Sequence, residues 1–349
     1  MNQHDIFNSL ASNAFDFLER GITEFDEAPK YSAIHFCAAV EMLLKARLMT
    51  EHWALIVSKP EEANLEKFMA GDFISATMKE ARIRLRDIAE EDIPNDVFSS
   101  FQALATHRNK MIHFFHADMN NEQARALIVA EHCRSWFHLH RLLDRWGDCF
   151  ADFKVNIAQA DRSMKKHKKY LTAKFNALKS ELSASGKAGK KPRACNACGF
   201  KAAIPKELSD SIVMVTCRVC DHSETQVGID CPHCKRSIVI ASGGYNNCPR
   251  CSGAIEPEDI SNWLCDHGDA SHGSGEDDYQ YRDANCGCCE GYHTVISLAG
   301  GYFCVKCFEL ADRLETCEWC NEPNTGDMEG SYFGGCGICE GKRGWGDNE

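Results

Sequence analysis

Long apolar runs are missing from this sequence. No uncharged stretch approaches the roughly 20 residues that a membrane-spanning helix needs. The first residues also lack the basic flank and apolar core of a secretory signal. Cysteine is scarce in the first half, which holds only Cys37, Cys133 and Cys149 of the 21 in the chain. We therefore expect a cytoplasmic protein without membrane contacts, whose two halves differ in architecture.

Helix-breaking residues are also scarce in residues 1–150, which contain three prolines and three glycines. Their apolar residues recur at helical rather than alternating spacing. This pattern predicts an all-α helical bundle over residues 1–153. Within it we expect helices from Tyr31 to about Val57, from Pro94 to about Phe115, and from about Glu122 to Trp146.

The second half is rich in cysteine, with 18 of the 21 at or beyond Cys195. Sixteen of these form eight Cys-x-x-Cys pairs, a spacing suited to metal rather than to disulfides in a chain without a secretory signal. Each pair supplies half of a tetrahedral zinc site. We therefore predict about four structural zinc ions as the only cofactors, bound by the following residues: Cys195, Cys198, Cys217, Cys220, Cys231, Cys234, Cys248, Cys251, Cys286, Cys289, Cys304, Cys307, Cys317, Cys320, Cys336 and Cys339.

The spacing of these pairs predicts small β-rich modules. Residues 194–257 resemble two zinc ribbons, with strands expected at 211–216 and 237–240. Residues 285–349 are expected to form a two-zinc module with a hairpin at Gly300-Gly301 and a helix at 308–314, an order typical of a treble clef. That order favours ligation of the 286/289 pair with 304/307. A cross-braced arrangement, 286/289 with 317/320, would instead resemble a RING or LIM module.

Two further segments separate these parts. Residues 154–193 are a basic helical or flexible linker, whose first part could prolong the preceding helix and whose second part, Ser183 to Pro192, is expected to be flexible. Residues 258–284 are an acidic connector rich in Gly and His. Cys265 and His267 in this connector could form a fifth metal site, although solvated loop histidines are the simpler interpretation.

Charge alternates along the chain, with net values of −7 for residues 1–150, +9 for 151–194 and −14 for 195–349. The cationic linker could track a polyanion backbone or dock on its own acidic neighbours. The acidic zinc half should repel nucleic acid except around its few Lys and Arg side chains.

A short polar motif stands out in the helical half, running from Arg108 to His113 as Arg-Asn-Lys-Met-Ile-His. It resembles the signature of HEPN domains, in which an Arg is followed after four to six residues by a His, and the polar residue after the Arg is also typical of them. The segment 41–46 is similar to an acidic-then-basic element of these bundles. The resemblance covers residues 1–150 and implies a metal-independent endoribonuclease whose active site forms at a homodimer interface.

The residue types of the motif suit RNA cleavage without metal. His113 could transfer protons near neutral pH, and Arg108 could clamp the scissile phosphate with its planar fork. Asn109 shares a helix face with His113 and could orient it, while His116 and Glu41 are auxiliary candidates. Positions 108 and 113 differ by about 140° around a helix, so Arg108 must reach round or a second chain must complete the site.

Simpler interpretations exist for each of these residues. His113 could be a half-buried core histidine, Arg108 a surface charge, and Glu41 with Lys45 a plain helix ion pair.

Two main functions are consistent with the sequence. The first is an RNA-cutting enzyme of toxin or antiphage-defence type, whose zinc half recognises RNA or a protein. The second is a non-catalytic zinc-ribbon adaptor in which the bundle dimerises and the zinc modules bind a protein partner. A nucleic-acid-binding regulator is a further alternative.

Overall fold

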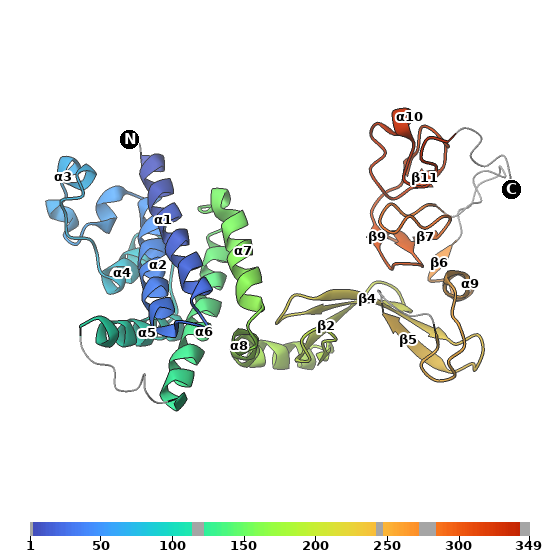
Figure 1. Cartoon of the computed structure of the whole chain (residues 1–349), viewed down its shortest axis with the longest axis horizontal. Coiled ribbons are helices and arrows are strands. Elements are labelled where there is room, and N and C mark those ends of the chain that lie inside the picture. Colours follow the sequence, from blue (N-terminus) through green and yellow to red (C-terminus); the bar gives the residue numbers. More distant parts are fainter. Residues whose placement is uncertain (1–2, 114–121, 242–246, 272–283, 343–349) are drawn as a thin grey trace. The chain divides into compact units, whose positions relative to one another are not determined.

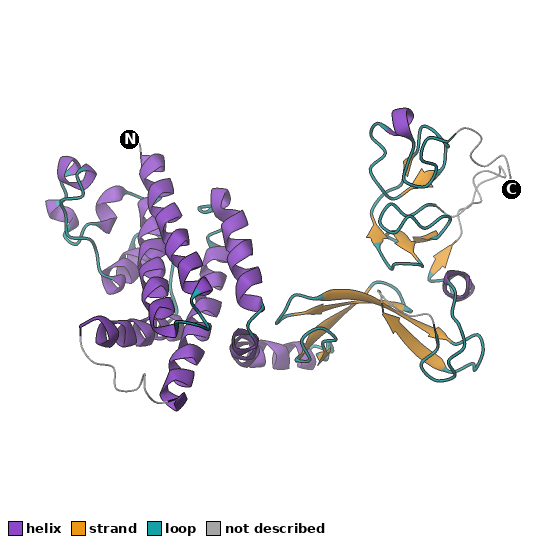
Figure 2. Ribbon diagram, in the orientation of Figure 1, coloured by secondary structure: helices purple, strands orange, loops and turns teal. Residues whose placement is uncertain are grey.

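The computed structural model describes residues 3–113, 122–241, 247–271 and 284–342. The chain divides into two compact units, 1–180 and 181–349. Helices fill the first unit and short strands dominate the second (Figures 1 and 2). This confirms the predicted helical N-terminal region and strand-rich, cysteine-clustered C-terminal region. Within the described residues, every helix is too short or too polar to cross a bilayer.

The first unit is a bundle built around α2, which runs antiparallel to α1 and also contacts α4, α5 and α6. Its core is apolar, and Leu43, Leu44 and Trp136 have no exposed surface. The helical elements that reach this unit are α1 (Gln3–Thr23), α2 (Pro29–Met49), η1 (Trp53–Ile56), η2 (Pro60–Glu62), α3 (Leu65–Met69), α4 (Met78–Asp87), α5 (Asn95–His113), α6 (Glu122–Arg145), η4 (Ala151–Phe153), α7 (Lys154–Lys165) and α8 (Lys168–Lys187).

Helix α2 begins at Pro29 but ends at Met49, eight residues before the end predicted from the sequence. The chain then makes the separate turn η1. Arg84 of α4 donates hydrogen bonds of 2.6 Å to the carbonyl oxygens of Leu55, Val57 and Ser58. Because the chain has left the α-helix at these residues, their carbonyl oxygens can accept hydrogen bonds from the Arg84 guanidinium. The helical spacing of apolar residues does not encode this tertiary contact.

Helices α5 and α6 follow the predicted course and pack against each other. The predicted continuation of α5 to Phe115 lies outside the described residues. Two polar contacts tie the helices together: the hydroxyls of Ser100 and Ser135 lie 2.7 Å apart in the core, and His107 Nε2 lies 2.9 Å from Glu131 Oε2. These contacts fix how α5 is rotated about its own axis.

The segment predicted to be a linker, residues 154–193, is mostly packed helix. Ile157 and Met164 of α7 and Tyr170 of α8 are buried, and α8 continues to Lys187. The prediction of a flexible stretch from Ser183 is therefore wrong as far as Lys187. The many Lys and Arg residues of this segment obscured its apolar residues, which recur at helical spacing. Apolar residues at this spacing are sufficient to bury one face of a helix.

The second unit contains a five-stranded antiparallel sheet in simple sequence order, β1-β2-β3-β4-β5. The two predicted ribbons share this sheet because β4 starts after the second cysteine pair and ends before the third. Each ribbon therefore uses β4 as one of its own strands. The strands are β1 (Arg193–Ala194), β2 (Lys201–Glu207), β3 (Ile212–Cys217), β4 (Ser223–Asp230) and β5 (Ser237–Ala241).

The rest of the second unit holds a four-stranded sheet, β6-β7-β8-β9, and a two-stranded sheet, β10-β11. The predicted hairpin at Gly300-Gly301 joins β7 and β8. The elements are α9 (Pro257–Asp266), β6 (Ala270–Ser271), β7 (Val295–Leu298), β8 (Gly301–Cys304), β9 (Leu310–Ala311), β10 (Glu315–Thr316), β11 (Pro323–Asn324) and α10 (Ser331–Gly334).

The predicted acidic connector, residues 258–284, is not a simple spacer. Its first part is α9, whose Ile260 and Leu264 are fully buried in a core shared by β4, β5, β7 and β8. Asp269, just after α9, accepts a 3.1 Å hydrogen bond from the backbone of Ser211. Ile260 and Leu264, four residues apart, lie on one face of α9 and anchor it to this core. The surrounding Asp, Gly and Ser residues obscured the helix in the sequence.

The treble-clef prediction is wrong at its helix. The chain after Cys307 forms strand β9, which pairs Leu310 with Phe303, instead of the expected helix over 308–314. Phe308 has a φ of 65° and lies in the left-handed region, so an α-helix cannot continue through it. Its ring packs against Phe303 with a centroid separation of 5.4 Å, which favours the strand arrangement.

Candidate functional site

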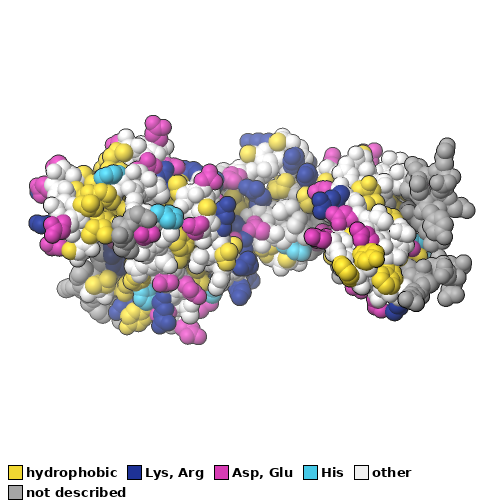
Figure 3. Space-filling model, turned by 90° about the horizontal axis from the view of Figure 1, so that it is seen from above, with side chains coloured by type: hydrophobic (Ala, Val, Ile, Leu, Met, Phe, Trp, Pro, Cys, Tyr) yellow, Lys and Arg dark blue, Asp and Glu magenta, His cyan; other side chains and the backbone are white. Residues whose placement is uncertain are grey.

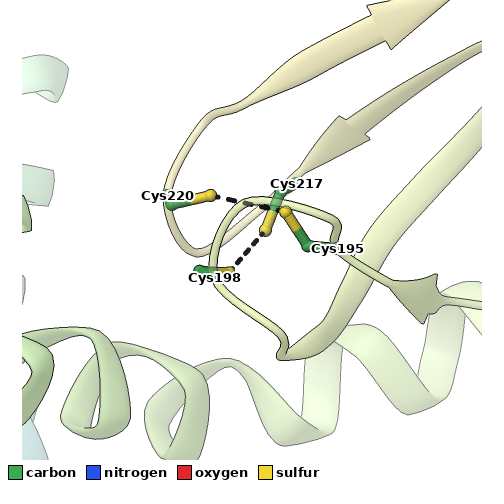
Figure 4. A group of neighbouring side chains, drawn as sticks. All are labelled: Cys195, Cys198, Cys217 and Cys220. Atoms are coloured by element: carbon green, nitrogen blue, oxygen red, sulfur yellow. Dashed lines mark hydrogen bonds between the residues drawn. The ribbon is translucent and has the colours of Figure 1, made fainter. Parts of the chain in front are cut away.

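Sixteen cysteines form four groups of four in the second unit, and the sulfur atoms within each group lie within 4.8 Å of one another. Figure 4 shows the first group, in which sulfurs from two tight turns converge on one point. The ligand pairing is sequential throughout, so the cross-braced alternative is excluded. The groups are Cys195, Cys198, Cys217 and Cys220; Cys231, Cys234, Cys248 and Cys251; Cys286, Cys289, Cys304 and Cys307; and Cys317, Cys320, Cys336 and Cys339.

The sulfur separations fit a tetrahedral metal ion. Cys195 and Cys220 are 3.6 Å apart, Cys198 and Cys217 are 3.7 Å apart, and pairs in the other groups are separated by 3.6 to 3.9 Å. A tetrahedron with Zn–S bonds of about 2.3 Å has edges of about 3.8 Å. All four groups could therefore hold a zinc ion, and four thiolates per ion would complete the coordination shell without water.

The backbone explains why each turn presents two sulfurs. The residue directly after the second cysteine has a positive φ in all eight turns, which reverses the chain under the metal site. In seven turns the first cysteine donates its backbone N–H to the carbonyl oxygen five residues later. The eight positive-φ residues are Gly199, Asp221, Lys235, Ser252, Glu290, Phe308, Asn321 and Glu340.

The third and fourth cysteine groups are joined through Asn285, which precedes the third group and is only 1% exposed. Its Nδ2 donates to Glu322 over 2.5 Å, and its Oδ1 accepts from the backbone N–H of His293 over 2.9 Å. Its backbone also bonds to Pro323 and Thr325. Asn285 was not predicted from the sequence, in which its only signal is a polar residue directly before a Cys-x-x-Cys pair.

A fifth metal site does not form among the described residues. Cys265 and His267 belong to none of the four groups. The ring of His267 stacks on Trp263 at a centroid distance of 3.7 Å, and its Nδ1 lies 2.8 Å from the Trp263 carbonyl oxygen. His267 is therefore the C-cap residue of α9, and its ring contacts the helix rather than a metal site.

The motif arginine of the helical unit has a specific partner. Arg108 of α5 donates from Nη2 to Glu41 Oε1 of α2 over 2.9 Å, across 67 residues of sequence. The two side chains are 22% and 27% exposed, so the pair lies at the edge of the core. Nε of Arg108 is buried and lacks a hydrogen-bond partner among the described residues. This guanidinium is therefore held by one carboxylate, and its Nε–H is buried without an acceptor among the described residues.

The neighbours of this pair on α2 are Cys37 and Lys45, one turn on either side of Glu41. Burial raises the pKa of Cys37 to about 12, although Arg108 lowers it and Glu41 adds to the rise, so this thiol stays neutral. Burial also lowers the pKa of Lys45, whose ammonium donates to Ser75 over 3.0 Å. Glu41 thus pairs with Arg108 of another helix rather than with Lys45, as a plain helix pair would require.

The other motif residues lie elsewhere on α5. Asn109 is exposed, as are Thr106 and Lys110 on the same side of the helix. Position 113 falls on this face by the helical repeat, although the side chain of His113 is outside what the structure describes, as is His116. The structure therefore brings Arg108 together with Glu41 and separates Asn109 from both.

No family model, curated protein or solved structure matches the chain.

Proposed function

We propose that the helical unit is a metal-independent endoribonuclease, which the zinc-binding unit directs to its target. The observation that carries this proposal is the Arg108–Glu41 pair, with its buried Nε–H left without a partner among the described residues. An unpaired buried donor costs about 1–3 kcal/mol unless a ligand satisfies it. An anion such as an RNA phosphate would supply the missing acceptor.

Each motif residue has a distinct role in this reaction. The 2′-hydroxyl must lose a proton, the phosphate must be stabilised as charge builds, and the 5′-oxygen must gain a proton. The imidazole of His113 would carry one of the protons, and the guanidinium of Arg108 would stabilise the phosphate while Glu41 holds it in place. Asn109, four residues before position 113, would orient the imidazole.

Helix geometry favours a site shared by two chains. Arg108 turns toward α2, whereas position 113 lies about 140° away on the exposed face of α5. Two copies packed so that position 113 of one chain faces Arg108 of the other would bring a histidine and an arginine to the same phosphodiester. A homodimer of the helical unit is therefore part of the proposal.

RNA cleavage by the full chain tests the proposal directly. Zinc-loaded protein in magnesium-free buffer should cut RNA and leave 2′,3′-cyclic phosphate ends. His113→Ala and Arg108→Ala should each reduce the rate by a factor of about 100 or more, because each removes a group that acts in the transition state.

The matched control is Lys110→Ala, because Lys110 is an exposed cation on the same helix between the two motif residues. It should retain most of the activity. Absence of cleavage by folded, zinc-loaded protein, or equal activity in all three variants, would exclude this active site.

A second candidate function, a protein-binding adaptor, is favoured by an aromatic pair on the fourth metal module. Tyr332 and Phe333 of α10 are 64% and 86% exposed, with rings 5.4 Å apart and nearly perpendicular. They stand between Gly330 and Gly335, whose φ values of 80° and 70° form tight bends on both sides. Adjacent, fully displayed aromatic rings on a metal-held turn are typical of a binding contact.

The charge around this aromatic pair indicates which partner it would bind. Within residues 317–342 five acidic side chains accompany a single basic one, Lys342. The backbone N–H of Glu318 donates to the buried Ser331 over 2.9 Å, which brings an acidic segment beside the rings. A basic peptide with apolar side chains would complement this surface.

The adaptor function predicts binding that depends on the two rings. The full chain should bind peptides rich in Lys and Leu, and Tyr332→Ser/Phe333→Ser should abolish that binding. Ile74→Ser, which removes an 80% exposed apolar side chain from the helical unit, is the control and should bind normally. Equal binding by both variants would exclude the aromatic pair as the contact.

A further inference from the structure

Charge is unevenly divided inside the metal-binding unit. Residues 181–227, which include the first cysteine group, carry seven Lys and Arg against five Asp and Glu. The described residues from 228 to 342, which include the other three groups, carry six against fifteen. In Figure 3, dark blue Lys and Arg side chains lie over the part of the second unit that Figure 1 labels β2. The acidic excess lies in residues 256–271, with five acidic side chains and no basic one, and in residues 284–342, with nine against three, so the first module belongs to the non-acidic part of the unit.

The sheet brings cations from three separate segments to this module. Ala194 of β1 pairs with Lys201 of β2. Arg193 is the neighbour of Ala194 in β1, so it lies one position along the strand from the residue that pairs with Lys201. The backbone N–H of Arg218, in the second turn of the module, donates to Ala202 over 2.9 Å. Lys201 therefore lies between the strand that carries Arg193 and the turn that carries Arg218. Lys190 and Lys191 lie three and two residues before the start of β1.

These cations are available to a ligand. The five side chains are all exposed. Arg218 comes within 3.9 Å of Glu181 with both side chains largely in solvent, and Arg193 lies 3.4 Å from the neutral Gln226. Exposed pairs at such distances contribute little, so a stronger anion could displace them. We call this set, Lys190, Lys191, Arg193, Lys201 and Arg218, the first-knuckle surface.

We propose that the first-knuckle surface binds the phosphate backbone of single-stranded RNA and is the contact that delivers the substrate to the ribonuclease. This inference rests on the proposed function, because it names which part of the chain holds the RNA that α5 would cut. Arg and Lys in a fixed arrangement bind successive phosphates by charge and by hydrogen bonds. The modules of the third and fourth cysteine groups are too acidic to share this role, since they would repel the same backbone. The cations of the second group, Lys235, Arg236 and Arg250, are the alternative contact that the control below tests.

The test uses the full zinc-loaded chain and a fluorescent single-stranded RNA with 2′-O-methyl riboses, which cannot be cut through the 2′-hydroxyl. Fluorescence anisotropy at several salt concentrations gives the affinity and its salt dependence. The variant is Lys191→Glu/Lys201→Glu/Arg218→Glu. The matched control, Lys235→Glu/Arg236→Glu/Arg250→Glu, reverses the same number of exposed charges at the second cysteine group of the same sheet.

The variant should lose at least tenfold in affinity, and its slope of log K against log salt should become shallower by about 2. Each phosphate contact with a single strand contributes about 0.7 to that slope. The control should change much less. Equal losses in both proteins, or no measurable RNA binding by the wild type, would overturn the proposal. Four zinc ions per chain in both proteins confirm that the sheet is intact, and Lys→Gln and Arg→Gln replacements serve if the charge reversals release zinc.

Failure of this inference and failure of the proposed function are distinguishable. If RNA is cut but the first-knuckle variant binds RNA normally, the ribonuclease stands and this surface is not its RNA contact. If RNA binding requires the surface but RNA is never cut, the surface stands and the catalytic assignment of Arg108 and His113 is wrong.

Discussion

Arg108 and Glu41 are 67 residues apart in the sequence, yet their side chains meet at 2.9 Å between α5 and α2. The pair joins the two helices of the bundle at the edge of its core. The hydrogen bond to the Glu41 carboxylate also fixes the direction in which the planar guanidinium of Arg108 points. Stability and the proposed chemistry therefore depend on the same contact.

Glu41→Gln should lower the free energy of unfolding of the helical unit by about 1 kcal/mol, because a partly buried charged hydrogen bond is lost. Urea denaturation measures the change. Glu62→Gln is the matched control, since Glu62 pairs with Lys59 at 2.8 Å with both side chains about two-thirds exposed. The control should change stability much less, because water screens an exposed ion pair. Equal effects of the two substitutions would show that the Arg108–Glu41 pair is merely a surface contact.

Zinc removal should unfold the second unit and leave the first intact. The four cysteine groups belong to the 181–349 unit, whose strands are short, whereas the bundle has an apolar core of its own. Binding of a structural zinc contributes about 10–16 kcal/mol in small metal-dependent domains, so these modules cannot fold without it.

Metal analysis should find four zinc ions per chain. After treatment with a strong chelator, hydrogen exchange should show protected amides in α2 and α6 and rapid exchange in β2 to β5. Loss of protection in α2 at the same time would contradict the independence of the two units.

Asn285→Ala should weaken zinc retention at the third and fourth cysteine groups. The substitution removes the bond to Glu322 and leaves the partly buried N–H of His293 without its acceptor, at a cost of about 1 kcal/mol. A colorimetric zinc chelator should then release two of the four ions faster than in the wild type.

The control for this experiment is Asn196→Ala, in the first module, where an exposed asparagine donates to Glu224 over 2.8 Å. Its release kinetics should resemble those of the wild type. If Asn285→Ala released zinc no faster than Asn196→Ala, the join between the last two modules would not depend on this side chain.

His132 should make the bundle less stable in acid. It is 4% exposed and lies among Phe25, Phe36 and Ser32, and burial lowers its pKa from 6.5 to about 3. Because the unfolded chain takes up the proton first, the stability that neutral His132 contributes is complete above pH 6.5. It is lost as pH falls toward 3, by at most about 1.4 kcal/mol per pH unit.

Denaturation of the helical unit at several pH values tests this prediction. His132→Gln should remove this part of the pH dependence, even if it lowers stability at neutral pH. His4→Gln, at the exposed start of α1, is the control for loss of an imidazole. Parallel stability profiles for His132→Gln and the wild type between pH 4 and 6.5 would show that His132 is not the group responsible.

Local patterns were enough to predict much of this architecture. The spacing of apolar residues predicted α5 and α6, and the Cys-x-x-Cys pairs predicted four metal sites, because a helix face and a tight metal-binding turn are each encoded within a few residues. The same logic failed where a distant contact decided the outcome. Phe308 turns left-handed and packs on Phe303, so a strand replaces the expected helix, and Ile260 and Leu264 anchor α9 where a connector was expected.

The sequence by itself determined the chemistry of this protein: sixteen paired thiols in one half, and an arginine and a histidine five residues apart in the other. Only the tertiary structure decided which pairs share a site, that β4 serves two ribbons, and that Arg108 is held by Glu41. The physical reason is that ligand types and turn geometry are local properties. Partner choice across 67 residues depends instead on how whole helices and strands pack.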